Sequence, residues 1–63
     1  MTPEDLRAFR GYRGWSQKDM AEAVSRYYAD LGIEVSRSAI LMMEIGARKI
    51  QPYVVKFCNE CVD

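Results

Sequence analysis

The chain has 63 residues, among them nine basic and nine acidic side chains, so it carries no formal net charge, and it contains no histidine. This length supports a single small domain near the lower limit at which a chain folds alone, and the ordinary apolar fraction argues against disorder. No apolar run is long enough to span a membrane, and the polar, acidic start is unlike a signal peptide, so we expect a cytoplasmic protein.

The first two predicted helices have clear starting signals. Thr2 is placed to cap the first helix, because a proline and two acidic residues follow it, and Gly14 marks the turn after that helix. Ser16 is placed to cap the second helix. Its apolar residues recur at helical spacing as far as Leu31, and Gly32 is expected to close it.

Two more helices are predicted in the second half of the chain. Ser36 is placed to cap the third, which Gly46 should end, and the fourth should begin at Pro52 and continue to the end of the chain. No segment has the alternating pattern of a strand. The sequence therefore predicts one all-α domain over residues 1–63 with four helices.

Two stretches of the chain resemble a known DNA-binding domain. Residues 6–21 read LRAFRGYRGWSQKDMA, and residues 35–52 read VSRSAILMMEIGARKIQP. Together they resemble the two halves of a Cro/CI-type (lambda-repressor-like, XRE family) helix-turn-helix domain, over nearly the whole chain. The resemblance implies a small four-helix domain derived from a five-helix relative. It also implies a complete small transcriptional regulator of a phage or mobile element, most simply a repressor that binds a palindromic operator as a homodimer.

The resemblance makes the third helix the recognition helix, which enters the major groove of double-stranded DNA with its N-terminal end leading. An exposed arginine there can read guanine through O6 and N7. The residues expected to contact bases are Arg37, Ser38, Leu41 and Met42. The residues expected to contact the DNA backbone are Gln17, Lys18, Ser36, Arg13, Arg48 and Lys49. Each of the charged residues could instead be an ordinary solvated side chain, and Gln17 a capping residue. Glu44 is expected to be structural, paired with an arginine of the first or third helix.

The chain departs from the family pattern in three respects, one of which is that it has four predicted helices where many relatives have a fifth. Leu41 and Met42 stand where relatives usually carry polar residues that look toward DNA. They could contact thymine methyl groups, pack on the second helix, or bind another protein. The second helix and the turn after it are also longer than in the compact pattern. This extension includes Tyr27 and Tyr28, which could brace the third helix or form part of a protein-binding surface.

The fourth helix carries more apolar side chains than a small core obviously needs, which favours a dimer face. The residues expected there are Val54, Phe57, Cys58 and Cys61. A structural zinc site needs four ligands, and the chain has only these two cysteines. The cysteines are expected to be small apolar residues near a core face, or to form an intersubunit disulfide on oxidation.

No catalytic residue, metal, cofactor or small-molecule ligand is expected, and the residues do not favour an enzyme. The alternative to a DNA-binding regulator is a protein-interaction module that reuses the helix-turn-helix fold. The absence of net charge and the apolar pair Leu41 and Met42 favour that alternative.

Overall fold

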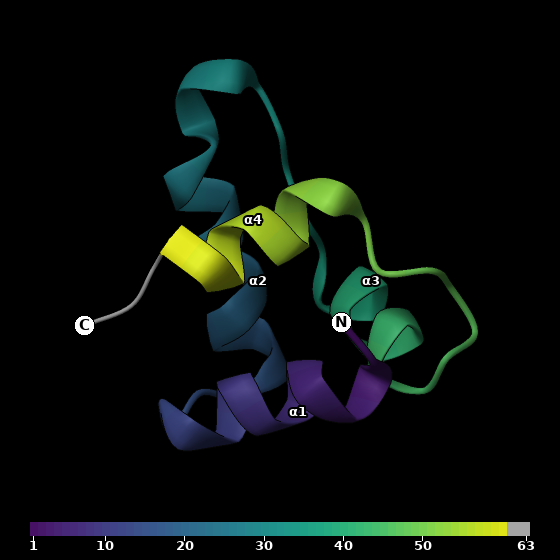
Figure 1. Ribbon diagram of the computed structural model, residues 1–63. Coiled ribbons are helices and arrows are strands. Elements are labelled where there is room, and N and C mark those ends of the chain that lie inside the picture. Colours follow the sequence, from purple (N-terminus) through teal and green to yellow (C-terminus); the bar gives the residue numbers. More distant parts are fainter. Residues whose placement is uncertain (61–63) are drawn as a thin grey trace.

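A computed structural model describes residues 1–60, which fold into four α-helices and one short 3₁₀ helix (Figure 1). The elements in chain order are α1 (Pro3–Tyr12), α2 (Gln17–Tyr27), η1 (Ala29–Leu31), α3 (Arg37–Glu44) and α4 (Pro52–Glu60). No strand occurs among these residues, which confirms the prediction of a small all-α domain. Within the same range, no helix is long and apolar enough to cross a membrane.

The predicted helix starts are confirmed by their caps. The Thr2 hydroxyl accepts a hydrogen bond from the Asp5 amide at 3.1 Å, and the Asp5 carboxylate accepts one from the Thr2 amide at 3.0 Å. Ser16 and Asp19 repeat this reciprocal arrangement at α2, with both distances at 3.0 Å. Each capping box satisfies two backbone amides that the helix itself leaves without acceptors.

Glycines in the left-handed region end two of the helices. Gly14 has φ +69° after α1, and the next amide, that of Trp15, donates to the carbonyl of Arg10 at 3.1 Å. Gly46 has φ +79° after α3, and the Ala47 amide donates to the carbonyl of Met42 at 3.0 Å. This closing pattern needs a positive φ that residues with a Cβ adopt only at a cost, so glycine at these positions ends the helix abruptly.

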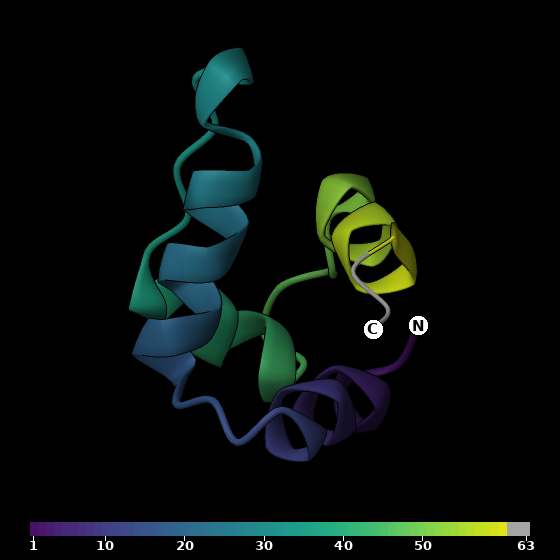
Figure 2. The same ribbon diagram turned by 90° about the vertical axis from the view of Figure 1, so that its left-hand side faces the viewer.

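The helices pack around α2. In Figures 1 and 2, α1 crosses the lower end of α2, α3 lies against both of them, and α4 covers the upper half of α2. The buried apolar core draws on all four helices and on the segments after α2 and before α3. Its members are Leu6, Met20, Ala21, Val24, Tyr28, Val35, Ile40, Met43, Val54, Phe57 and Cys58.

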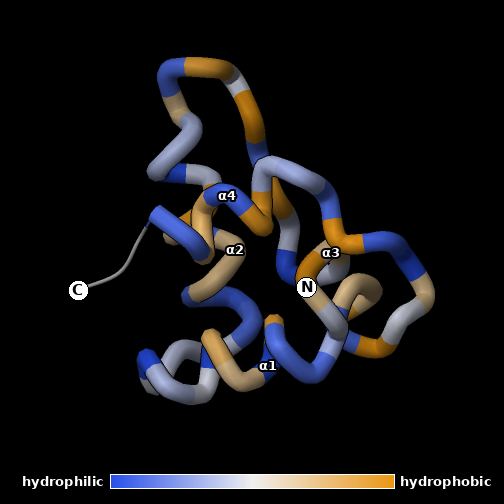
Figure 3. The backbone as a smooth tube through the Cα atoms, in the orientation of Figure 1, coloured by the Kyte–Doolittle hydropathy of each residue, from blue (hydrophilic) through white to orange (hydrophobic). Residues whose placement is uncertain are grey.

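The second helix is shorter than the sequence pattern predicts. It ends at Tyr27, and η1 follows as a separate turn in which the Leu31 amide bonds to the Tyr28 carbonyl at 3.0 Å. Leu31 is 72% exposed, so it was wrongly assigned to the apolar stripe of the helix. The apolar stretches around η1 lie at the end of the molecule farthest from α1 (Figure 3). At this point the Tyr28 side chain is buried, and its hydroxyl donates to the carbonyl of Tyr53 in α4 at 2.7 Å.

The two tyrosines of the extension pack on α4 rather than on α3. The Tyr27 ring meets the Phe57 ring edge-on at 5.3 Å, and its hydroxyl is hydrogen-bonded to Glu60. The Tyr28 ring meets Tyr53 at 5.8 Å. These contacts are with α4 and not with the third helix that the sequence analysis named. A protein-binding role, the other one left open, stays a prediction, and Tyr27 is 45% exposed.

The segment between η1 and α3 is fastened back onto α2 by one serine. The Ser25 hydroxyl accepts a hydrogen bond from the Val35 amide at 2.8 Å and donates one to the Val35 carbonyl at 3.2 Å. A hydroxyl can do both at once. This pair of bonds fixes the position of Val35, one residue before the cap of α3. The start of α3 is therefore held next to α2 despite the longer turn.

The predicted dimer face on α4 is wrong for the residues that the structure describes. Val54, Phe57 and Cys58 are 0%, 2% and 5% exposed, because they pack into the core of their own chain. The Phe57 ring alone lies within 6.4 Å of three other aromatic rings. So small a domain needs its fourth helix to complete its own core. Cys61, the other residue predicted there, lies outside the described residues.

Candidate nucleic-acid interface

The third helix has a buried face and an exposed face. Its buried side chains are Ile40, Met43 and Glu44. Its exposed side chains are Arg37, Ser38, Leu41 and Met42. The positions on each face are separated by one, three or four residues, as the period of an α-helix requires. All four residues predicted to contact bases therefore lie together on the outer face of α3.

The N-terminal end of α3 is capped by Ser36, whose hydroxyl accepts a hydrogen bond from the Ala39 amide at 3.1 Å. This cap places Arg37 and Ser38 in the first turn, where both side chains are exposed. The first turn also carries the positive end of the helix dipole, which favours a phosphate or another anion nearby.

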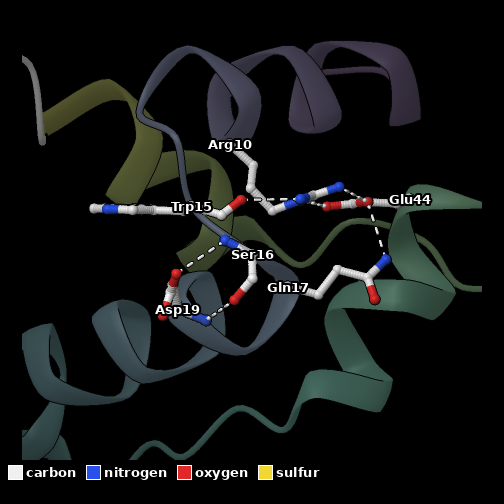
Figure 4. A network of polar contacts seen from close by, with 6 residues as sticks. All are labelled: Arg10, Trp15, Ser16, Gln17, Asp19 and Glu44. Atoms are coloured by element: carbon white, nitrogen blue, oxygen red, sulfur yellow. Dashed lines mark hydrogen bonds and ion pairs between the residues drawn. The ribbon is translucent and has the colours of Figure 1, made fainter.

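The C-terminal end of α3 is fixed by a network centred on Glu44 (Figure 4). Arg10 of α1 donates to the two carboxylate oxygens of Glu44 from Nε at 2.7 Å and from Nη2 at 3.0 Å. The third donor of Arg10, Nη1, bonds to the Trp15 carbonyl at 2.9 Å. This confirms the structural role predicted for Glu44, which is 2% exposed. The hydrogen bonds to Glu44 raise the pKa of Arg10, which therefore keeps its charge.

Gln17, the first residue of α2, joins the same network. Its Nε2 donates to Glu44 Oε1 at 3.4 Å, so its side chain supports the third helix, as predicted. Its contact with DNA stays a prediction. Lys18 follows it and is exposed at the same end of α2. The network thus connects α1, the start of α2 and the end of α3, and holds the outer face of α3 in one orientation.

Arg13 stacks on two aromatic rings. Its guanidinium lies over the Phe9 ring at 4.7 Å and the Trp15 ring at 5.3 Å. Both rings pack against Phe57 of α4, and Trp15 points away from Glu44 in Figure 4. Stacking on aromatic faces is a favourable use of an arginine side chain. The contact of Arg13 with the DNA backbone stays a prediction.

Arg48 and Lys49 are both exposed on the segment that follows α3. The Arg48 amide donates to the Met42 carbonyl at 3.1 Å, so the backbone of this segment is held to the last turn of α3. The Arg48 side chain lines a groove together with Ser36 and Ala39 of the α3 N-terminus. The fold thus brings Ser36 and Arg48 near each other. Glu34 lines the same groove, which the sequence reasoning did not anticipate.

One further exposed residue of this face was missed. Ile45, at the end of α3, is 60% exposed, beside Leu41 at 39% and Met42 at 42%. Leu41 and Met42 are therefore not buried against α2, although more than half of the surface of each is covered. The spacing of Ile45, four residues after Leu41 and three after Met42, could have placed it on the same face. The outer face of α3 is polar in its first turn and apolar beyond it.

The face offers hydrogen-bond donors, positive charge and apolar surface. No group of three or more His, Cys, Asp or Glu side chains that could hold a metal ion occurs in residues 1–60. Comparison of the chain with protein-family models, with curated proteins and with solved structures gives no match.

Proposed function

We propose that this chain is a sequence-specific DNA-binding transcriptional regulator that acts as a repressor. The proposal rests on how the rest of the fold holds α3 in place. Its inner face is buried, Glu44 joins its end to Arg10 and Gln17, and its outer face presents Arg37 and Ser38 from a capped N-terminus. Reading base edges requires side chains on an element that other parts of the fold hold still.

The charges near this face support the same proposal. Arg37 and Lys18 lie at the starts of α3 and α2, and Arg48 and Lys49 follow the end of α3. The one acid within α3, Glu44, is paired with Arg10 in the interior. These four basic residues can meet phosphates although the chain as a whole has no net charge and exposed Glu34 lines the groove beside Arg48.

Repression requires no chemistry, only occupancy of a promoter. We propose that two copies bind a palindromic operator whose half-sites lie about one helical turn apart. Because Val54, Phe57 and Cys58 are enclosed in the core, the contact between the two copies uses another surface.

Binding of a labelled duplex to the purified chain over a series of salt concentrations tests the proposal. The logarithm of the association constant should fall linearly with the logarithm of salt, with a slope of about −0.9 for each phosphate neutralised. A folded protein that binds no duplex even at low salt would contradict the proposal.

The second candidate function is a protein-interaction module on the same fold. The observation that favours it is the exposed apolar group formed by Leu41, Met42 and Ile45, since surfaces that bind proteins are apolar at their centre. Binding to a protein partner through these residues would depend only weakly on salt, whereas binding to DNA should weaken steeply.

A further inference from the structure

The exposed side chains of α3 follow one another in a definite order. Arg37, Leu41 and Ile45 are spaced four residues apart, and Ser38 and Met42 run beside them. From the N-terminal end, the outer face offers a guanidinium and a hydroxyl first, and then three apolar side chains that are 39%, 42% and 60% exposed. A recognition helix with this order meets bases through two different kinds of contact.

The apolar part of the face limits what it can recognise in a major groove. Leucine and isoleucine side chains neither donate nor accept hydrogen bonds, and the methionine sulfur accepts only weakly, so they satisfy the amino and carbonyl groups of base edges poorly. Thymine is the base that presents an apolar group there, its 5-methyl. Contact with that methyl removes apolar surface of both partners from water and is favourable.

The surroundings of the apolar group favour DNA as its occupant. Arg37 stands one turn before Leu41, and Arg48 lines the groove beside Ser36 and Ala39 at the same end of α3. Lys49 follows Ile45 in the chain, and the exposed acid Glu34 also lines that groove. The α3 carboxylate, Glu44, is turned inward to Arg10 and is 2% exposed. The phosphates beside a major groove complement the three basic side chains near this face.

We propose, on the basis of the function proposed above, that Leu41, Met42 and Ile45 recognise thymine methyl groups, so that each operator half-site carries thymines beside the guanine that Arg37 reads. The hydrogen-bonding part of the half-site is short, because it faces only the first turn of α3. The remaining specificity comes from methyl groups.

Substitution of thymine by deoxyuridine tests this directly. Uracil pairs with adenine as thymine does and differs only by the missing methyl. In a duplex enriched from a random pool by the protein, each thymine is replaced in turn. Affinity should fall on the order of fourfold for each methyl group that the apolar residues contact, as expected for one buried methyl. Thymines outside the half-sites should show no change and serve as the internal control.

Protein variants show which side chains are responsible. Leu41→Ala and Met42→Ala should bind the thymine duplex more weakly and should no longer distinguish it from its uracil counterpart. Leu31→Ala is the matched control, because Leu31 is also an exposed apolar residue, at 72%, but lies in η1. Leu31→Ala should keep the full difference in affinity between the thymine duplex and the uracil duplex. All three side chains are exposed, so the variants should fold, which circular dichroism verifies.

The outcomes separate this inference from the function on which it rests. If no duplex is enriched, the proposed function is wrong and the inference is wrong with it. If a duplex is enriched but binds equally well with uracil, the protein is a DNA-binding regulator and the methyl reading is wrong. The same holds if Leu41→Ala and Met42→Ala distinguish thymine from uracil as fully as the parent does.

Discussion

Arg10 and Glu44 form a two-pronged ion pair, at 2.7 and 3.0 Å, that joins α1 to the end of α3. Glu44 is 2% exposed, and Gln17 donates to the same carboxylate from the start of α2. A carboxylate this deeply buried is tolerated only with such partners. The pair therefore ties the position of the candidate recognition helix to the stability of the whole domain.

Arg10→Met should destabilise the fold, because it leaves the Glu44 carboxylate buried without its main partner. The expected loss in the free energy of unfolding is about 3–5 kcal/mol. Urea unfolding followed by circular dichroism measures it, with Arg7→Met on the exposed side of α1 as the control. The double variant Arg10→Met/Glu44→Leu should recover much of the loss. An Arg10→Met protein as stable as the parent would show that the pair does not hold α3.

Arg37→Ala should remove sequence preference. If Arg37 reads a base, the preferred duplex should lose about 1–3 kcal/mol of binding free energy while unrelated duplexes change little. Competition binding against a set of operator variants gives the ranking. Arg26→Ala, an exposed arginine near the opposite end of α2, should leave the ranking intact. An unchanged ranking in Arg37→Ala would remove Arg37 from the base-reading role.

Arg48→Ala should weaken binding to all sequences alike. Loss of one phosphate contact should make the slope of log affinity against log salt shallower by about 1. Parallel salt titrations of the parent and the variant measure this slope. Lys56→Ala, which alters an exposed lysine of α4, provides the control for the loss of one positive charge. A slope identical to that of the parent would exclude this contact.

Stability should fall in acid partly through the two capping boxes. The hydrogen bonds from Thr2 and Ser16 lower the pKa of Asp5 and Asp19 below their ordinary value. The unfolded chain binds these protons more readily than the folded chain does. The carboxylates therefore stabilise the fold above their ordinary pKa, near pH 4. This contribution is lost as the pH falls through the lower pKa of the folded state. Asp19→Asn should show a flatter decline of urea midpoint from neutral to acidic pH. An equal decline in Asp19→Asn and in the parent protein would show that this cap contributes nothing to the pH dependence of stability.

Local signals in the sequence predicted most of the fold. The serine and threonine caps and the stop glycines depend on a few neighbouring residues, so the starts of α1, α2 and α3 and the turns after α1 and α3 could be read directly. The end of α2 was not read from the sequence, and at that point the Tyr28 hydroxyl bonds to Tyr53, a partner 25 residues away. Tertiary contacts of this kind override a helical pattern.

The candidate site was predicted less completely, for a related reason. Periodicity places Arg37, Ser38, Leu41 and Met42 on one face, but it does not say which face the core covers. For the same reason the apolar residues of α4 were wrongly assigned to a dimer face, because periodicity does not tell whether the chain's own core covers them, as it does here. The stacking of Arg13 on Phe9 and Trp15 joins residues four and two positions apart, but the contact of both rings with Phe57 of α4 is one that no local pattern encodes.

Selection of random duplex DNA by the purified protein, with the enriched sequences bound again at two salt concentrations, tests the central claim most directly. The account predicts a palindromic consensus, with half-sites about one helical turn apart, whose binding weakens steeply as salt is raised. A folded protein that enriches no sequence would contradict it, and would shift the role of α3 to the binding of a protein through Leu41, Met42 and Ile45.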